Sequence, residues 1–307
     1  MNKKMTSREI LFPNGKAAYR NKKNIVMDNP LAAGAQQANT NLLDLPVFDI
    51  VTFDKLGNNG RLGNQLFQIA ATIAIAKRNN ADAIFPKWFC KYTNKDFSLF
   101  FENQIKQESS INAPNVYNEK SFSYSPIPYN KGLCLRGYYQ SEKYFEDCKD
   151  DIRFYFSPKK SVIDKLKQKY KKYLEGNTCC VHIRRGDYVN HLFHYVCDVD
   201  YYNRAIEHIK QITNIDRFLI FSDDINWCKE NFKSDIFYFV EGNKDAEDLF
   251  VMSLCNNHII SNSSFSWWGS WLCENEKKII IAPNRWFSEK STTSDYQDVY
   301  TNNMIRI

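Results

Sequence analysis

The segment Val181–Asp187, which reads Val-His-Ile-Arg-Arg-Gly-Asp, combines residues that could carry chemistry. Its apolar, β-branched start predicts a buried strand, and the two arginines follow where that strand ends. Open α/β sheets bind their ligands at this end of their strands. Because a guanidinium can hold a phosphate through a forked pair of N–H donors, the segment predicts phosphate recognition by arginine instead of by a metal ion.

The two arginines are expected to play different roles. Neighbouring residues of a strand point to opposite faces, so Arg184 should share a face with His182 while Arg185 points away from it. We therefore expect one arginine at the ligand and the other buried against a carboxylate. The alternative is a surface ion pair between an arginine and Asp187, and an adhesion role for Arg-Gly-Asp is weaker because the triplet adjoins a predicted buried strand.

A glycine-rich segment, Gly60–Gln65, lies between a predicted strand at 47–53 and a predicted helix at 66–78. Glycines let the backbone approach a ligand closely, and the start of a helix attracts anions. The glycine spacing differs from the dinucleotide-binding pattern, which disfavours an oxidoreductase. Asn64 and Gln65 add neutral hydrogen-bonding groups, although Asn64 could equally be only the N-cap of the helix.

Two more predicted strands end in polar residues. The strand at 218–222 is followed by Asp223 and Asp224, either of which could contact a ribose or a base, or cap the next helix. The segment Ser261–Ser266 offers serine hydroxyls and backbone N–H groups at the start of a helix, which suit a pyrophosphate. Plain capping by serine is the alternative, but four polar positions exceed what one cap requires, so we favour pyrophosphate binding.

Metal binding has weaker support. Asp198 and Asp200 spell a DxD, which holds a divalent metal in some sugar transferases, but they precede a predicted helix and we interpret them as its cap. His/Cys/Asp/Glu clusters with convincing metal spacing are missing from the sequence, so we expect neither a metal nor another cofactor. His191 and His194 follow the arginine segment and remain open as possible bases.

The elements that must position these residues alternate between strand and helix. A strand, the glycine segment, a helix and a second strand at 83–85 form a βαβ unit. The stretch from about 88 to 157 is aromatic and irregular, and Gly137–Gln140 within it could line an acceptor groove or belong to the core. From about 158 onward the alternation predicts a second doubly wound domain. Its expected strands are 179–183, 218–222, 236–240, 258–261 and 278–282, and its expected helices are 161–174, 199–212, 246–256 and 266–273.

Composition excludes several classes of protein. The 307 residues are 43% hydrophobic and 15% aromatic, which argues against a disordered chain. Residues 1–46 carry +4 of the formal charge of +6, so the remainder is nearly neutral and gives little support to nucleic-acid binding. The longest apolar run, Ile69–Ala76, is far too short to span a membrane. The nine cysteines are expected to be free and mostly buried, as in a reducing cytoplasm.

Taken in order, five segments resemble the α-1,2-fucosyltransferases, the inverting family that moves fucose from GDP-fucose to galactose. The resemblance implies an α/β, GT-B-like fold with two Rossmann-like doubly wound domains facing a cleft. It places acceptor contacts in 47–157 and the GDP-fucose site in 158–307, after an extension of unknown order at 1–46. The segments are Gly60–Gln68, His182–Tyr188, Phe221–Cys228, Asp248–Met252 and Ser261–Gly269.

The resemblance also implies roles for individual residues. Arg184 would contact the β-phosphate and stabilise the charge that grows on the departing GDP without a metal. Asn64 would reach the reaction centre, and Asp187 would orient the arginines or act as a base. Asp223 would contact ribose or guanine, and the serines would cradle the pyrophosphate. The implied donor site comprises His182, Arg184, Arg185, Asp223, Ser263, Ser264, Phe265 and Ser266, and the implied acceptor side comprises Gly63, Asn64 and Gln65.

The expected partners are therefore GDP-fucose and a galactose-containing glycan, in the synthesis of a surface polysaccharide such as an O-antigen or capsule. No nucleic-acid partner is expected, and peripheral association with a membrane stays open. Eukaryotic relatives carry a Golgi membrane anchor that this sequence does not show, so we expect a cytoplasmic protein. The competing hypotheses are a GDP-fucose transferase of different linkage or acceptor, and a non-catalytic module that binds a nucleotide or a glycan.

Overall fold

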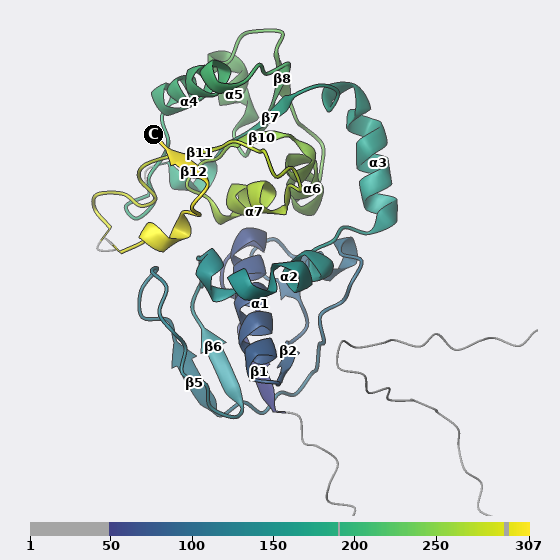
Figure 1. Cartoon of the computed structure of the whole chain (residues 1–307), viewed down its shortest axis with the longest axis vertical. Helices are drawn as coiled ribbons and strands as arrows, with labels where there is room; N and C mark the ends of the chain where they lie inside the picture. The colour runs from purple at the N-terminus through teal and green to yellow at the C-terminus, as the bar shows by residue number, and fades with distance from the viewer. Residues whose placement is uncertain (1–48, 190, 292–294) are drawn as a thin grey trace, which may run out of the picture. The chain divides into compact units, whose positions relative to one another are not determined.

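The structure, a computed structural model, describes residues 49–189, 191–291 and 295–307 (Figure 1). The extension expected at 1–46 and the first residues of the strand expected at 47–53 lie outside the described residues. These described residues form one compact unit. Two parallel sheets organise this unit.

The first sheet has the strand order β2-β1-β6-β5, and all its pairings are parallel. Helix α1 connects β1 to β2, so a predicted βαβ unit is confirmed at the start of the fold. A small antiparallel pair, β3 with β4, lies beyond β2 in the chain. The bounds are β1 Ile50–Thr52, α1 Leu62–Arg78, β2 Asp82–Ile84, β3 Phe89–Cys90, β4 Lys95–Asp96, β5 Asn115–Asn118, β6 Leu133–Arg136 and α2 Lys149–Tyr155.

The second sheet has the order β12-β11-β10-β7-β8-β9 and is also parallel throughout. The chain winds from β7 in one direction through β8 and β9, and then in the other through β10, β11 and β12. The order therefore reverses between β7 and β10, and open sheets bind ligands outside the carboxyl ends of strands at such a point. The strands are β7 Thr178–Ile183, β8 Arg217–Ser222, β9 Phe237–Phe239, β10 Asn257–Ile259, β11 Ile280–Ala282 and β12 Met304–Arg306.

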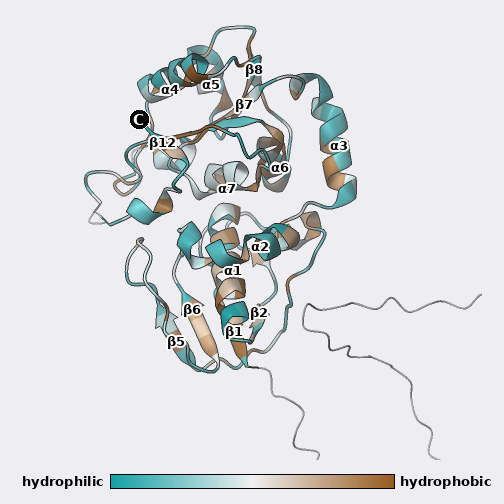
Figure 2. Cartoon of the chain, viewed as in Figure 1, coloured by the Kyte–Doolittle hydropathy of each residue, from teal (hydrophilic) through white to brown (hydrophobic). Residues whose placement is uncertain are grey.

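Among the described residues, five α-helices accompany the second sheet, and short 3₁₀ helices occur in both halves of the unit. Helix α3 is hydrophilic over much of its surface, whereas β1 and β6 are hydrophobic (Figure 2). The helices are α3 Lys160–Tyr170, α4 Val199–Ile212, α5 Ile225–Asn231, α6 Asp245–Leu254 and α7 Ser264–Leu272. The 3₁₀ helices are Phe97–Phe100, Glu142–Tyr144, Glu146–Cys148, Lys171–Tyr173, Gly186–Tyr188 and Gln297–Val299.

The packing of α1 against α7 joins the two halves. The ring of Phe67 in α1 lies 4.5 Å from that of Trp267 and 4.9 Å from that of Trp268, both in α7. Both tryptophans are fully buried. All nine cysteines are buried and none forms a disulfide, which agrees with expectation.

Several boundaries differ from the predictions. Helix α1 begins at Leu62 instead of 66, so Gly63, Asn64 and Gln65 lie in its first turn and Arg61 is its N-cap. The strands β5 and β6 lie in the stretch that we expected to be irregular. Three of the four β5 residues are exposed, so this edge strand lacks an apolar pattern. The capping interpretations are confirmed, because Asp198 accepts from the N–H of Tyr201 and Asp224 accepts from the N–H of Trp227.

Candidate active site

Arg184 stands directly after β7, at the point where the strand order reverses. Its guanidinium forms ion pairs with Asp187 and, at 2.9 Å, with Asp223. The guanidinium also lies 5.3 Å from the centre of the Tyr188 ring, and the side chain is only 16% exposed. A guanidinium has five N–H donors, so two carboxylate contacts leave donors for a ligand. The arrangement fixes a positive charge on the wall of a cavity.

Arg185 turns the other way, as the alternation along a strand predicts. Its Nε lies 3.1 Å from Asp224, and its guanidinium lies 4.1 Å from the centre of the Trp227 ring. Its backbone N–H donates to Asp223 at 2.9 Å. Among the described residues that line the cavity Arg184 is present and Arg185 is not. Direct contact between Arg185 and a donor therefore stays a prediction, while its ion pair with a carboxylate is observed.

His182 lies two residues before Arg184 on the same face and lines the same cavity. Its Nδ1 is 2.9 Å from the hydroxyl oxygen of Ser261, which follows β10. Burial, and then the charge of Arg184, lower the pKa of His182 to about 3. The imidazole is therefore neutral at ordinary pH and can serve the site as a hydrogen-bonding group, not as a cation.

The start of α7 forms the neighbouring wall, and its serines differ in what they do. Ser263 is the N-cap and accepts from the N–H of Phe265 at 3.3 Å, so the capping alternative holds for this residue. Ser266 donates to the backbone carbonyls of Ser261 and Ser263 inside the turn. Ser263, Ser264 and Phe265 line the cavity, whereas Ser266 is buried beneath it. The nine-residue helix α7 begins at this wall, and the first N–H groups of a helix favour a bound anion.

The start of α1 meets the start of α7. A Cβ atom on Gly63 would lie 2.5 Å from the backbone nitrogen of Phe265, so only glycine allows this close approach. The side-chain oxygen of Asn64 accepts from the hydroxyl of Ser264 and from the amide of Gln140, both at 2.7 Å. Because its oxygen is occupied by donors, Asn64 is oriented with its NH₂ group as the donor. Asn64 is therefore held by residues from both halves of the unit.

The side chain of Gln65 bonds to other residues of the protein, although we expected it on the acceptor side. Its amide donates to the carbonyl of Gly60 at 2.8 Å and its oxygen accepts from the indole of Trp88 at 2.8 Å. Gln65 is fully buried and lies outside the cavity lining among the described residues. Gly63 and Asn64 do line the cavity. A direct role for Gln65 in acceptor binding stays a prediction.

The cavity between these walls has a volume of about 1070 Å³. Residues at the ends of β7, β8 and β10 form one side, and residues near the start of α1 and after β6 form the other. The sequence did not indicate two of the contacts that organise this cavity. Arg61 pairs with Asp187 at 3.3 Å, and Gln140 holds Asn64. Gln140 was included in a possible acceptor groove, but no local pattern indicates its partner 76 residues away.

Carboxylates also line the cavity. Burial alone would raise the pKa of Asp187, but the charges of Arg184 and Arg61 outweigh burial and hold that pKa below its usual value. Farther along, burial raises the pKa of Asp248 to about 6, against the hydrogen bond from Asn243. Asp187 is thus a weak base in this state, which favours the role of orienting arginines over that of accepting a proton.

In residues 49–189, 191–291 and 295–307, His, Cys, Asp and Glu side chains nowhere gather in a group of three or more that could hold a metal ion. A helix long and apolar enough to cross a membrane is likewise not found in those residues.

The architecture is that of a GT-B-like glycosyltransferase. A solved structure of NodZ α-1,6-fucosyltransferase soaked with GDP-fucose superposes with a TM-score of 0.51 at 13% sequence identity, covering 73% of this chain and 92% of that one. At this identity the similarity establishes the fold alone. Residues 40–307 match glycosyl transferase family 11, and the chain belongs to that family. The fold and family predicted from the five sequence segments are confirmed.

Curated relatives include three proteins with described activities. An O-antigen biosynthesis glycosyltransferase, WbnK of Escherichia coli, is 29% identical over 296 residues, covering 80% of this chain and 98% of the relative. An α-1,2-colitosyltransferase of Escherichia coli is 40% identical over 168 residues, or 52% of this chain and 57% of the relative. Galactoside α-(1,2)-fucosyltransferase 2 of Oryctolagus cuniculus is 24% identical over 237 residues, or 69% and 65%.

Proposed function

We propose that this protein transfers L-fucose from GDP-β-L-fucose to the 2-hydroxyl of a galactoside with inversion, giving an α-1,2 linkage. The position of Arg184 carries the proposal, because it presents a fixed cation to a large cavity at the point where the strand order of a parallel sheet reverses. Membership in glycosyl transferase family 11 and the activities of the relatives support the sugar, the acceptor and a role in O-antigen or capsule synthesis.

Arg184 would stabilise the leaving group. Two of its nitrogens already contact Asp187 and Asp223, which hold the guanidinium in one orientation before a ligand arrives. A diphosphate gains negative charge as its bond to the sugar breaks, and a preoriented donor aimed at that charge lowers the barrier. The neutral imidazole of His182 and the first N–H groups of α7 lie on the same wall and complete a phosphate-binding environment.

The reaction would be a single displacement. The 2-hydroxyl oxygen of the acceptor forms a bond to C1 of fucose while the bond from C1 to the diphosphate oxygen breaks, and GDP leaves with the bonding electrons. The hydroxyl proton passes to a base or to water. The transition state has oxocarbenium character, as in glycoside hydrolysis. Asn64, with its amide oriented by Ser264 and Gln140, would donate near the reacting centre from the opposite half of the unit.

We assign to Asp187 the role of orienting the side chains of Arg184 and Arg61. Its two carboxylate oxygens contact one arginine each, from opposite sides of the cavity. Its lowered pKa makes it a poor proton acceptor in the observed state. Among the other cavity carboxylates, Asp223 is assigned to the ribose or guanine of the donor, since it lies at the end of β8 beside Arg184.

Metal independence is part of the proposal, because the arginine would supply the charge that a cation supplies in other transferases. The test is incubation of the purified protein with GDP-fucose and lactose in an excess of chelator. We expect a fucosylated product whose NMR spectrum places an α-linked fucose on C2 of galactose. A folded, GDP-binding protein that transfers fucose only after a divalent metal is added would contradict metal independence.

Transfer of colitose is the second candidate, because the α-1,2-colitosyltransferase shares 40% identity over 168 residues with this chain. Equal concentrations of GDP-fucose and GDP-colitose offered together would distinguish the two. Predominant transfer of fucose supports the first proposal, and predominant transfer of colitose replaces it.

The remaining alternatives need different experiments. A labelled GDP-fucose screen over several acceptors would reveal a transferase of different linkage. Binding of GDP-fucose without turnover on any acceptor would indicate a non-catalytic module. Action in the cytoplasm belongs to the same proposal, and fractionation of cells that produce the protein would test it.

A further inference from the structure

One end of the cavity is aromatic, and the proposed roles above do not use it. Phe122 and Tyr138 line it from the side of the first sheet, and Phe193 and Phe287 line it from the side of the second. The Phe122 and Tyr138 rings stack with 5.7 Å between centroids and 15° between planes. Phe287 lies 4.7 Å from both Phe122 and Phe193. These four residues are called the aromatic cluster below.

The aromatic cluster is continuous with the proposed diphosphate site. The ring of Phe193 lies 5.3 Å from that of His194. The ring of His194 stacks on Tyr188 at 4.0 Å with the planes 1° apart, and Arg184 lies over Tyr188. A molecule bound at the aromatic cluster therefore lies beside the position where the leaving group would develop its charge.

The chemistry of the cluster suits a neutral sugar and not a second anion. A hexose ring presents C–H groups on one face, which pack favourably against the electron-rich face of an aromatic ring, and hydroxyls around its rim. His191 lines the cavity nearby, and its Nδ1 accepts from the N–H of Phe193 at 3.1 Å. In the neutral ring the proton is therefore on Nε2, which makes that atom a donor suited to a sugar hydroxyl.

We propose that the aromatic cluster is the subsite for the acceptor's hexose ring. The proposal rests on the proposed function and deepens it, because it names the residues that select a galactoside as acceptor. The hexose would stack on the paired rings of Phe122 and Tyr138, with Phe193 and Phe287 closing the subsite from the other half of the unit. Its 2-hydroxyl would then face the fucose held against Arg184.

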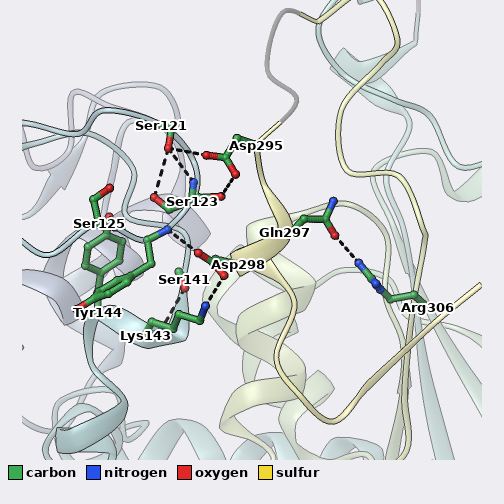
Figure 3. Close-up of polar contacts among 11 residues, drawn as sticks. Ser121, Ser123, Ser125, Ser141, Lys143, Tyr144, Asp295, Gln297, Asp298 and Arg306 are labelled. Atoms are coloured by element: carbon green, nitrogen blue, oxygen red, sulfur yellow. Dashed lines mark hydrogen bonds and ion pairs between the residues drawn. The ribbon is translucent and has the colours of Figure 1, made fainter.

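The loop that carries Phe122 is fixed by the C-terminal segment of the chain (Figure 3). Asp295 accepts from the hydroxyls of Ser121 and Ser123, on either side of Phe122. Asp298 accepts from the backbone N–H of Tyr124 at 2.8 Å and from Lys143 at 2.5 Å. The loop is therefore held before an acceptor binds, and little conformational entropy remains to be lost at this wall.

The turn that carries Tyr138 is fixed by Glu119. The carboxylate of Glu119 accepts from the N–H of Tyr138 at 2.6 Å and from the N–H of Tyr139 at 2.8 Å. Tyr139 has φ +54°, a conformation that a residue with a side chain adopts only when its surroundings stabilise it. The same turn delivers Gln140 to Asn64. Glu119 is thus a positioning residue for both the stacking ring and the amide network.

The test compares acceptor and donor kinetics in Phe122→Ala and Tyr138→Ala. Loss of one stacking ring should raise the KM for lactose by about 10-fold or more, while the Kd for GDP stays within about twofold of wild type. Tyr138→Phe keeps the ring and should keep a near-normal KM. Phe154→Ala serves as the matched control, because Phe154 lies in α2 with 55% of its surface exposed. An unchanged lactose KM in both folded alanine variants would overturn the proposal.

A second measurement separates this proposal from the proposed function. Saturation-transfer NMR detects lactose on the GDP-bound protein without any chemistry. If lactose binds to the wild type and not to Phe122→Ala, the subsite is supported even if the enzyme transfers a sugar other than fucose. Transfer of fucose with lactose saturation unaffected by either alanine variant would refute the subsite while the function stands. Should Phe122→Ala fail to bind GDP, Phe122→Leu, which keeps apolar volume without a ring face, takes its place in both measurements.

Discussion

The two sides of the cavity are built differently. The side that we assign to the donor, called the donor side below, consists of residues at or shortly after the ends of β7, β8 and β10, so short segments of sequence supply it. The side that we assign to the acceptor, called the acceptor side below, draws on the start of α1, the loop at 119–124 and the turn at 137–140, which long-range contacts hold together. Strand ends place a charge directly, whereas a sugar-binding wall requires several loops to be fixed against one another. Substitutions far from the cavity should therefore disturb the donor side less than the acceptor side.

The largest expected effect is on the donor side, from Arg184→Ala. Removing a donor that faces developing charge typically lowers kcat by roughly 100- to 1000-fold, and we expect a loss in this range with lactose binding retained. Arg285→Ala is a matched control, because Arg285 also pairs with a carboxylate, at 2.6 Å from Glu289, and lies over a tyrosine ring. Steady-state kinetics of both variants, with a thermal melt to show folding, give the comparison. Near-normal turnover in Arg184→Ala would remove the leaving-group role.

The acceptor side should show a pH-dependent stability that depends on Glu119. Burial raises the pKa of Glu119 from 4.5 to about 7, although the two N–H groups that it accepts from oppose this, and the tyrosines at 117, 139 and 144 surround it. At a pH between 4.5 and about 7, Glu119 holds a proton in the folded state that it has released in the unfolded state. The free energy of unfolding therefore falls as the pH rises through this range. The contribution is up to about 3 kcal/mol.

Glu119→Gln provides the measurement, because glutamine does not titrate. Chemical denaturation at pH 5, 6, 7 and 8 should show the wild type losing stability relative to the variant as the pH rises. A difference that stays constant, or that changes in the opposite direction, would contradict the raised pKa of this carboxyl group.

The contact between the two sides should be sensitive to Gly63→Ala. The added Cβ would lie 2.5 Å from the nitrogen of Phe265, so α1 and α7 must separate. Overpacking of this kind costs roughly 1–3 kcal/mol, and we expect lower unfolding free energy together with reduced kcat, since Asn64 and Ser264 move apart. Chemical denaturation and steady-state kinetics on the same preparation measure both effects. Full stability with full activity would show that the close approach of α1 to α7 is not required.

The smallest effect is expected from Ser264→Ala, which removes one of the two hydrogen bonds to the oxygen of Asn64. A single hydrogen bond is worth about 1 kcal/mol, so kcat should fall about fivefold while the Kd for GDP changes little. Ser253→Ala is the control, because that hydroxyl donates to Phe250 inside α6. An effect on GDP binding larger than the effect on kcat would assign Ser264 to the donor instead.

Local sequence predicted where the strands and caps around Arg184 lie, and the reasons are physical. Strand β7 is a continuous buried run that ends before two arginines, so Arg184 could be placed at a strand end, and helix α4 has an apolar face of period 3.6. The alternation along a strand also separated the environments of Arg184 and Arg185. The caps formed by Asp198 and Asp224 follow from their positions before a helix.

The acceptor side could not be predicted in the same way. The exposed strand β5 lacks an apolar pattern, and the short β6 lies among aromatic loops, so the stretch around them looked irregular. The rings of Phe122, Tyr138 and Phe287 meet only because three distant segments are held together in the fold. The first turn of α1 was missed because Gly63 is a weak helix former, and only its contact with α7 explains its presence there.

The proposed mechanism depends on Arg184, which would stabilise the departing diphosphate without a metal ion. A crystal structure with GDP-fucose, grown in the presence of a chelator, tests it directly. We expect the Arg184 guanidinium within hydrogen-bonding distance of a β-phosphate oxygen. A guanidinium still turned to Asp187 and Asp223 alone, or donor binding that requires an added divalent ion at that position, would contradict it.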